Sequence, residues 1–229
     1  MATQVLLAKG AMRILASPMI VPSYFMALLK VRGFSNDLRR CMMAVDTAPS
    51  FPDSFFVTTL VAAEDHRNAI HPGVDPIAIL RVLVVWARTG KIQGASTIEQ
   101  QLVRVVLSRY ERTLRRKLWE QILAIALSSH RPKLKIAKAY LSMAFYGSGQ
   151  YGISALERCC GSDLEAATQI NVSRIIAQLK YPEPLSPSSE WHETIQRRVH
   201  YIAKRINKPT NDPSQATRRM LRAPEPNVS

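Results

Sequence analysis

Cysteine is scarce in this sequence. The 229 residues contain three, Cys41, Cys159 and Cys160, and the last two are adjacent, so a disulfide framework is not expected and the redox compartment cannot be assigned from them. His71 is expected in a turn, where a His is more often a local hydrogen-bond partner than a metal ligand, so a metal site made by the protein is not expected. The sequence also lacks internal repeats and sustained period-two alternation of apolar residues, which favours a mainly helical fold.

Acidic residues are also few. There are 17 Asp and Glu against 31 Lys and Arg, a formal net charge of +14. Such a surface attracts polyanions, and nucleic acid, anionic lipid and pyrophosphate all qualify. A basic helical nucleic-acid binder is suggested by charge alone and leaves the polar stretch 96–101 unexplained, so we expect no nucleic-acid partner.

A long uncharged apolar run is missing at the N-terminus. Residues 5–29 are largely apolar, but Lys9 and Arg13 interrupt them and Pro18 and Pro22 follow, so no run reaches the roughly 18 uncharged residues of a spanning helix. A clean signal-peptide cleavage site is missing too. Two interpretations stay open: an arm that packs on the core, and an amphipathic segment that lies on an anionic membrane.

The organisation expected from the sequence is one helical domain with two appendages. Residues 1–50 form the N-terminal arm, residues 51–208 form the domain, and residues 209–229 are polar, Pro-bearing and expected to be disordered. Apolar residues at spacings of three and four predict helices over 54–67, 76–89, 133–146 and 164–179, and a last helix that ends near residue 206. Residues 147–152 are expected to form a tight Gly-rich loop.

The first candidate site residue is Glu64. It follows Val57, Leu60 and Val61 at helical spacing, so it ends an apolar stripe and is partly removed from water, as suits a general base. The simpler interpretation is a helix-end carboxylate that pairs with a nearby arginine, and this feature alone favours it. After the turn that follows, Asp75 is expected to cap the next helix.

Two further stretches carry candidate residues. Ser96 and Glu99 have the spacing of a capping box, and the helix that follows displays polar side chains suited to an oxyanion; an ordinary capped surface helix is the alternative. The basic run 109–117 precedes Glu120, which shares a helix face with Arg116 and Lys117. A basic run is usually a solvated face, but this one also suits a phosphate-binding wall that one carboxylate orients.

Taken together, these stretches resemble the peptidoglycan glycosyltransferases, family 51 of the glycosyltransferases. Four motifs occur in the family's order: Glu64-Asp65 with His71 and Gly73-Val74-Asp75; residues 94–102; Arg112-Thr113-Leu114 with Arg116-Lys117 and Glu120; and residues 135–141 followed by Phe145-Tyr146-Gly147. The resemblance implies a lysozyme-like helical domain with a core lobe and a smaller membrane-facing lobe.

The resemblance also implies a reaction, the polymerisation of lipid II into glycan strands. The 4-hydroxyl of an acceptor attacks, with inversion, a donor linked to a polyprenyl pyrophosphate. By position, the catalytic residues are Glu64 as base, Asp65 as its support and Glu120, which positions the cationic wall. The residues implied to bind substrate are Ser96, Thr97, Gln100, Gln101, Arg104, Arg116, Lys117 and His71.

The cofactors, partners and location follow from the same resemblance. No cofactor is required, and a divalent cation, Mg²⁺ or Mn²⁺, held through the substrate pyrophosphate is left open. The partners are lipid II, the growing glycan, an anionic membrane surface and, as an open alternative, other cell-wall synthesis proteins. The expected place is the outer, periplasmic face of the cytoplasmic membrane, with the chain peripheral or anchored by its N-terminus.

The sequence departs from the family pattern at several positions. Asn68 and Ala69 replace an aromatic pair, Arg104 replaces Lys, and Ser142 replaces Asn. These departures motivate a second hypothesis, a non-catalytic relative that binds lipid II or cell-wall partners. A lysozyme-like wall hydrolase is a further alternative, although a hydrolase of this kind usually needs an acid and a second carboxylate across the bond.

Overall fold

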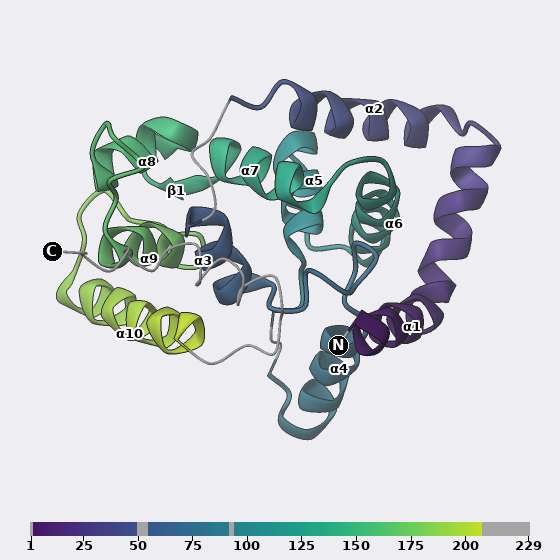
Figure 1. The fold of residues 1–229 in the computed structure, drawn as a ribbon, viewed down its shortest axis with the longest axis horizontal. Coiled ribbons are helices and arrows are strands. Elements are labelled where there is room, and N and C mark those ends of the chain that lie inside the picture. The colour runs from purple at the N-terminus through teal and green to yellow at the C-terminus, as the bar shows by residue number, and fades with distance from the viewer. Residues whose placement is uncertain (1, 50–54, 92–93, 208–229) are drawn as a thin grey trace, which may run out of the picture.

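A computed structural model describes residues 2–49, 55–91 and 94–207 (Figure 1). Its elements in chain order are α1 (Ala2–Leu28), α2 (Arg32–Asp46), α3 (Phe55–Glu64), α4 (Pro76–Thr89), α5 (Ile98–Leu107), α6 (Leu114–His130), α7 (Lys133–Met143), β1 (Phe145–Gly147), β2 (Gln150–Tyr151), α8 (Gly152–Cys160), α9 (Gln169–Gln178) and α10 (Ser189–Ile206). The predicted mainly helical fold is confirmed. The expected tail 209–229 lies outside the described residues.

The core is one apolar cluster that joins two groups of helices. Helices α2, α6 and α7 surround α5, and α3 packs against α9 and α10 (Figure 1). Fully buried side chains supply the contacts on both sides, among them Leu60 on α3, Leu102 on α5, Leu123 on α6 and Ile176 on α9. Since burial of one such side chain contributes roughly 1.5–3 kcal/mol, this cluster fixes the ends of α3 and α5 relative to each other.

Several predicted boundaries change. The helix predicted over 54–67 ends at Glu64, and the helix predicted over 164–179 begins only at Gln169. The expected loop at 147–152 is a short antiparallel hairpin, and residues 152–160, which the sequence did not assign to a helix, form α8. The expected cap Asp75 is confirmed, because its carboxylate accepts a hydrogen bond from the N–H of Ala78, and Pro76 occupies the first helical position.

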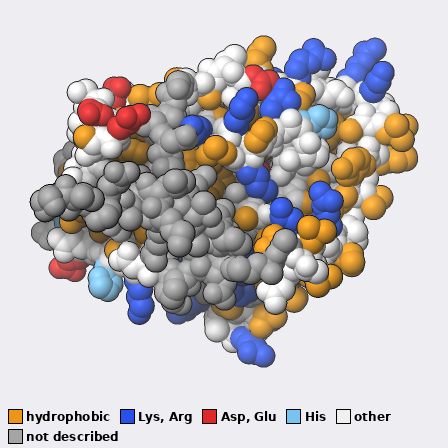
Figure 2. Space-filling model, viewed as in Figure 1, with side chains coloured by type: hydrophobic (Ala, Val, Ile, Leu, Met, Phe, Trp, Pro, Cys, Tyr) orange, Lys and Arg blue, Asp and Glu red, His pale blue; other side chains and the backbone are white. Residues whose placement is uncertain are grey.

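The predicted N-terminal arm contains two helices, α1 and α2, and α1 passes through Pro18 and Pro22 and bends along its course (Figure 1). One face packs on α6, where Met12 and Ala16 are buried and the Ser23 hydroxyl donates to the carbonyl of Ile122 at 3.0 Å. The remaining faces expose apolar side chains, which Figure 2 shows along the right edge of the molecule. By length and composition, residues 3–28 can cross a membrane, although two charges interrupt them.

Candidate active site

The candidate site is a cleft of about 640 Å³ between the end of α3, the start of α5 and the inner face of α10. Its walls combine carboxylates, cations and small polar groups, among them Glu64, Ser96, Thr97, Gln101, Arg104 and Arg198. The cleft therefore gathers residues from the first and second motifs, which lie about thirty positions apart in the chain.

Glu64 lies at the C-terminal end of α3 and pairs with an arginine. Arg198 Nη2 on α10 donates to Glu64 Oε1 at 2.7 Å and to the carbonyl oxygen of Ala63 at 2.9 Å. The Glu64 side chain keeps 16% of its surface exposed and faces the cleft. The C-terminal end of a helix carries partial negative charge, which disfavours a carboxylate there. The Arg198 cation therefore stabilises both the Glu64 carboxylate and the backbone carbonyl of Ala63 at this end of α3.

Asp65 follows Glu64 but points into the protein. Its buried carboxylate accepts hydrogen bonds from His71 Nε2 at 2.9 Å, from Asn68 Nδ2 at 3.1 Å and from the backbone N–H of Ile98 at 3.2 Å. Burial alone would raise the pKa of Asp65, but these hydrogen bonds and the charges of His71 and Lys133 outweigh burial and lower the pKa. Asp65 therefore ties the residues after α3 to the N-terminus of α5.

A second layer of charge lies beneath Asp65. Glu99 on α5 is fully buried and pairs with the ammonium of Lys133, the first residue of α7. Asn68 Nδ2 also approaches Glu99 Oε1 at 3.4 Å, and Lys133 Nζ lies 3.4 Å from His71 Nδ1. The two carboxylates are thus joined through one amide, one imidazole and one ammonium.

Three of these residues have the geometry of a cation site. Asp65, His71 and Glu99 each place one possible ligand atom within 4.8 Å of the others. The Lys133 ammonium already binds Glu99, so the group fits a salt-bridged network better than a metal site. The expectation that the protein makes no metal site stays a prediction.

The start of α5 differs from the expected capping box. Thr97, not Ser96, is the N-cap, and its hydroxyl accepts from the N–H of Gln100 and donates to the carbonyl of Gly73 at 2.7 Å. Ser96 Oγ instead accepts from Lys117 Nζ at 2.9 Å and from Arg104 Nη2 at 3.3 Å. The capping-box prediction was wrong because Glu99 turns inward to Lys133 and does not reach back to residue 96.

Glu120 on α6 gathers three cations. Arg104 binds it with two hydrogen bonds of 3.0 Å, Lys117 Nζ lies 2.7 Å from Oε1, and Arg116 Nη1 contacts Oε2. Burial lowers the pKa of Lys117, an effect that the Glu120 charge partly offsets. One carboxylate against three cations leaves an excess positive charge beside Ser96, at the wall of the cleft.

The structure places the predicted residues in two groups. Glu64, Asp65, Ser96, Thr97, Gln101 and Arg104 line the cleft, whereas Arg116, Lys117 and Glu120 lie behind Arg104. Gln100 is fully buried and accepts from Lys117 Nζ at 2.6 Å, and Gln101 accepts from the Tyr140 hydroxyl at 2.6 Å. His71 is buried against Asp65 and does not line the cleft.

Sequence reasoning missed Arg198 and Lys133. Arg198 comes 134 residues after Glu64, and nothing in its local pattern distinguishes it from the neighbouring basic residues of α10. Lys133 begins a helix that was correctly expected to start there, but its contact with Glu99 needs the packing of α7 on α5. The usable signal was the simpler interpretation of Glu64 as a helix-end carboxylate that pairs with an arginine: the structure has such a pair, but the sequence did not identify Arg198 as the partner.

A family model described as Transglycosylase matches residues 30–207. The chain belongs to this family. The match starts at residue 30 and so includes α2. At the level of the family, this helical domain is a peptidoglycan glycosyltransferase domain, and the first, second and third motifs of that resemblance supply the cleft and the cations behind it.

Curated relatives agree with the family. The chain is 34% identical over 170 residues to penicillin-binding protein 1A of Aquifex aeolicus, which covers 73% of this chain and 23% of the relative. It is 33% identical over 174 residues to penicillin-binding protein 1A of Escherichia coli K12, a match that covers 75% of this chain and 20% of the relative. It is 32% identical over 171 residues to penicillin-binding protein 1A of Rickettsia felis, a match that covers 72% of this chain and 21% of the relative. The chain thus spans between a fifth and a quarter of the length of these relatives.

Proposed function

We propose that this chain polymerises lipid II into glycan strands. The acceptor 4-hydroxyl lies at Glu64, which removes its proton as the oxygen attacks the anomeric carbon of the donor. The donor carbon inverts, its bond to the lipid pyrophosphate breaks, and the electron pair of that bond leaves with the pyrophosphate. The placement of Glu64 in the same cleft as Arg104 supports this assignment.

The cations at the cleft are suited to the leaving group. Pyrophosphate leaves readily, so the reaction needs a base on the acceptor side and fixed positive charge where negative charge grows. Arg104 and the pair Arg116 and Lys117, oriented by Glu120, supply this charge. A divalent cation, where one takes part, would add to it through the pyrophosphate oxygens, so no metal cage from the protein is required.

We also propose supporting roles for the neighbours of Glu64. Asp65 does not reach the acceptor in this arrangement, since His71, Asn68 and the α5 N-terminus occupy its carboxylate. We propose that Asp65 and His71 hold the first and second motifs in position relative to each other. We propose that Gln101 and Ser96 contact the donor substrate. The domain acts at the outer face of the cytoplasmic membrane, with α1 at or in the bilayer.

The test is polymerisation of labelled lipid II by the full chain and by Glu64→Gln, which keeps the shape of the side chain but is not a base. We expect polymer from the wild type and a loss of at least about a thousandfold in the variant, in the range of general-base and positioning effects. Glu157→Gln, on the exposed part of α8, is the matched control and keeps full activity.

Two other outcomes would replace this proposal. Binding of lipid II without polymer, unchanged by Glu64→Gln, would identify a non-catalytic relative. Release of reducing ends from finished peptidoglycan would identify a hydrolase.

A further inference from the structure

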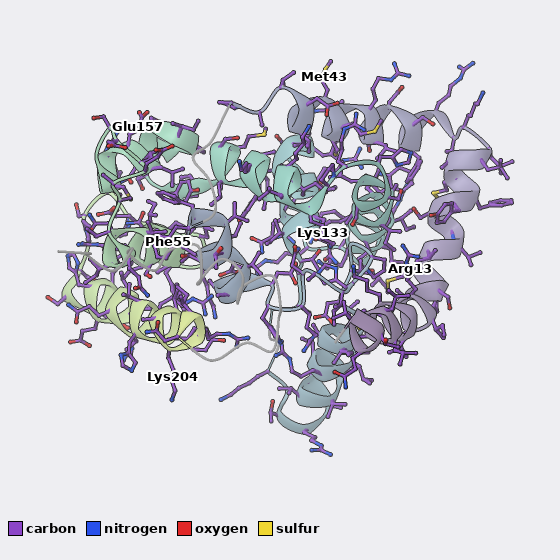
Figure 3. The ribbon with its side chains drawn as sticks, viewed as in Figure 1. Arg13, Met43, Phe55, Lys133, Glu157 and Lys204 are labelled. Atoms are coloured by element: carbon purple, nitrogen blue, oxygen red, sulfur yellow. The ribbon has the colours of Figure 1, made fainter. Side chains whose placement is uncertain are left out.

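A second cavity lies on the other side of the Asp65 network from the cleft. It measures about 570 Å³ and is enclosed by α1, by the loop 69–72, by the end of α6 and by the start of α7. Figure 3 labels two of the residues that line it, Arg13 on α1 and Lys133 on α7. No role of the cleft residues in glycosyl transfer requires this cavity.

Both charged side chains of α1 line this cavity. Lys9 and Arg13 are the only charged residues in that 27-residue helix, they lie four positions apart and so share a face, and both line the cavity. In the described part of the chain, neither makes an ion pair or a side-chain hydrogen bond, and no Asp or Glu lines the cavity. Both side chains are exposed, so they lie at the mouth of the cavity, where two cations without a partner among the described residues favour an anion from outside.

Polar groups at the base of the cavity add to this preference. Lys133 supplies a third cation, and Ser17 and Ser128 supply hydroxyl groups, whereas the Ser129 hydroxyl already donates to the carbonyl of Ala126 at 2.7 Å. Lys133 is engaged with Glu99 and lies near His71 Nδ1, so its charge is partly neutralised, but the ammonium has three N–H donors and can bind a further acceptor. The chemistry of this end of the cavity is that of a phosphate monoanion or diester site.

Apart from the imidazole of His71, the rest of the lining is mostly apolar. Ile14, Ile20, Tyr24, Ile70 and Ile125 contribute to the wall. The outer surface nearby is apolar as well: Leu80, Leu83 and Trp86 on α4 are more than half exposed, as are Leu15 and Phe25 on α1. A free anion would contact only the cationic side chains of the cavity. An amphiphile with a phosphate group would contact the cationic side chains and the apolar surface as well.

We propose that this cavity binds the phosphate headgroup of an anionic phospholipid, with Lys9 and Arg13 as its principal contacts and the acyl chains along the apolar surface of α1 and α4. The cavity thereby sets how α1 and the domain meet an anionic bilayer. The proposal does not rest on glycosyl transfer, so it can fail while lipid II polymerisation succeeds, and the reverse.

The test compares binding of the full chain to vesicles of phosphatidylcholine alone and of phosphatidylcholine with phosphatidylglycerol, measured by co-sedimentation. The pocket variant is Lys9→Gln with Arg13→Gln. The control is Lys30→Gln with Arg32→Gln, which removes two exposed cations just after α1 that do not line the cavity. Since any cation near an anionic surface adds to binding, the control measures that general loss.

We expect the wild type to prefer the phosphatidylglycerol vesicles, and the pocket variant to lose at least about tenfold more of this preference than the control. A charge-conserving variant, Lys9→Arg with Arg13→Lys, should keep it. Equal losses in the pocket and control variants, or no preference in the wild type, would overturn the proposal.

A second arm distinguishes a lipid from a free anion. Thermal unfolding is followed in neutral detergent with either short-chain phosphatidylglycerol or inorganic phosphate at the same concentration. We expect the lipid to raise the Tm of the wild type and not of the pocket variant. A rise of equal size with inorganic phosphate would mean a free-anion site and would overturn the lipid assignment.

Discussion

Arg198 Nη2 lies 2.7 Å from Glu64 Oε1 and 2.9 Å from the carbonyl oxygen of Ala63. One guanidinium group thus fixes both the proposed base and the last turn of the helix that carries it. The Arg198 guanidinium also lies 4.9 Å from the ring centre of Tyr201, one turn farther along α10, which limits its freedom to move. The orientation of Glu64 therefore depends on the packing of α10 against α3.

We predict that Arg198→Gln lowers the kcat of lipid II polymerisation by about tenfold or more, because a charge-assisted hydrogen bond contributes about 1.5–3 kcal/mol. Arg198→Lys restores the charge but not the reach and planar shape of the guanidinium, so it should recover part of the rate. KM for lipid II is expected to change less than kcat, since Arg198 holds the base. The measurement is initial rates over a range of lipid II concentrations.

The neighbouring Arg197 provides the control for this prediction. It is exposed, and among the described residues its side chain bonds only to Thr194 Oγ1, so Arg197→Gln should leave both constants unchanged. A loss of rate in Arg197→Gln as large as that in Arg198→Gln would contradict a specific role of Arg198 and would indicate a general need for positive charge on α10.

Asn68 occupies a position between two buried acids. Its amide nitrogen lies 3.1 Å from Asp65 Oδ2 and 3.4 Å from Glu99 Oε1. Asn68→Asp preserves shape but replaces the donor with a third carboxylate, so we predict a loss of unfolding free energy of about 3 kcal/mol or more. Urea unfolding measures this loss. Asn36→Asp, on an exposed turn of α2, is the control and should shift the midpoint little.

The buried carboxylate of Asp65 makes stability depend on acid pH. Its pKa lies below the ordinary 3.8 because the hydrogen bonds and charges of His71, Asn68 and Lys133 outweigh the effect of burial. A lowered pKa in the folded state means that the stabilisation is complete above the ordinary value and is lost as pH falls from there through the folded value. Stability from this source is therefore full at neutral pH.

We predict that Asp65→Asn is about 1–3 kcal/mol less stable at neutral pH, since it presents an amide to three donors, and that it loses less stability on acidification than the wild type. The measurement is the urea midpoint from about pH 6 to about pH 3. Glu157→Gln should keep the acid dependence of the wild type. An Asp65→Asn curve parallel to the wild-type curve would mean that other carboxylates set the dependence.

The sequence predicted what depends on local pattern. The cap by Asp75 and the helical position of Glu64 follow from the residues around them, and both are confirmed. The ion pair between Glu64 and Arg198 and the pair between Glu99 and Lys133 join helices that meet only through packing, so no spacing rule could find them. The capping box failed for the same reason, because a distant lysine binds Glu99 more strongly than a local cap would.

The last prediction concerns Gly73, which brings the first motif against α6. Its φ is +114°, and a Cβ there would lie 2.5 Å from the carbonyl oxygen of Ala124. The carbonyl of Gly73 also accepts the Thr97 hydroxyl bond at the start of α5, so a shift of this turn would move both motifs. We predict that Gly73→Ala loses about 3 kcal/mol or more of unfolding free energy, together with most of the polymerisation activity.

Gly90 is the control that separates the two causes of the predicted loss, the strained backbone conformation and the close contact with Ala124. It also has a positive φ, +66°, but a Cβ there would have open space around it. Gly90→Ala therefore measures the backbone cost alone, about 1–2 kcal/mol, and should leave activity nearly unchanged because Gly90 ends α4 away from the α5 contact. Equal losses in the two variants would mean that the close approach to Ala124 contributes nothing, and that the turn at Gly73 is held by its backbone conformation alone.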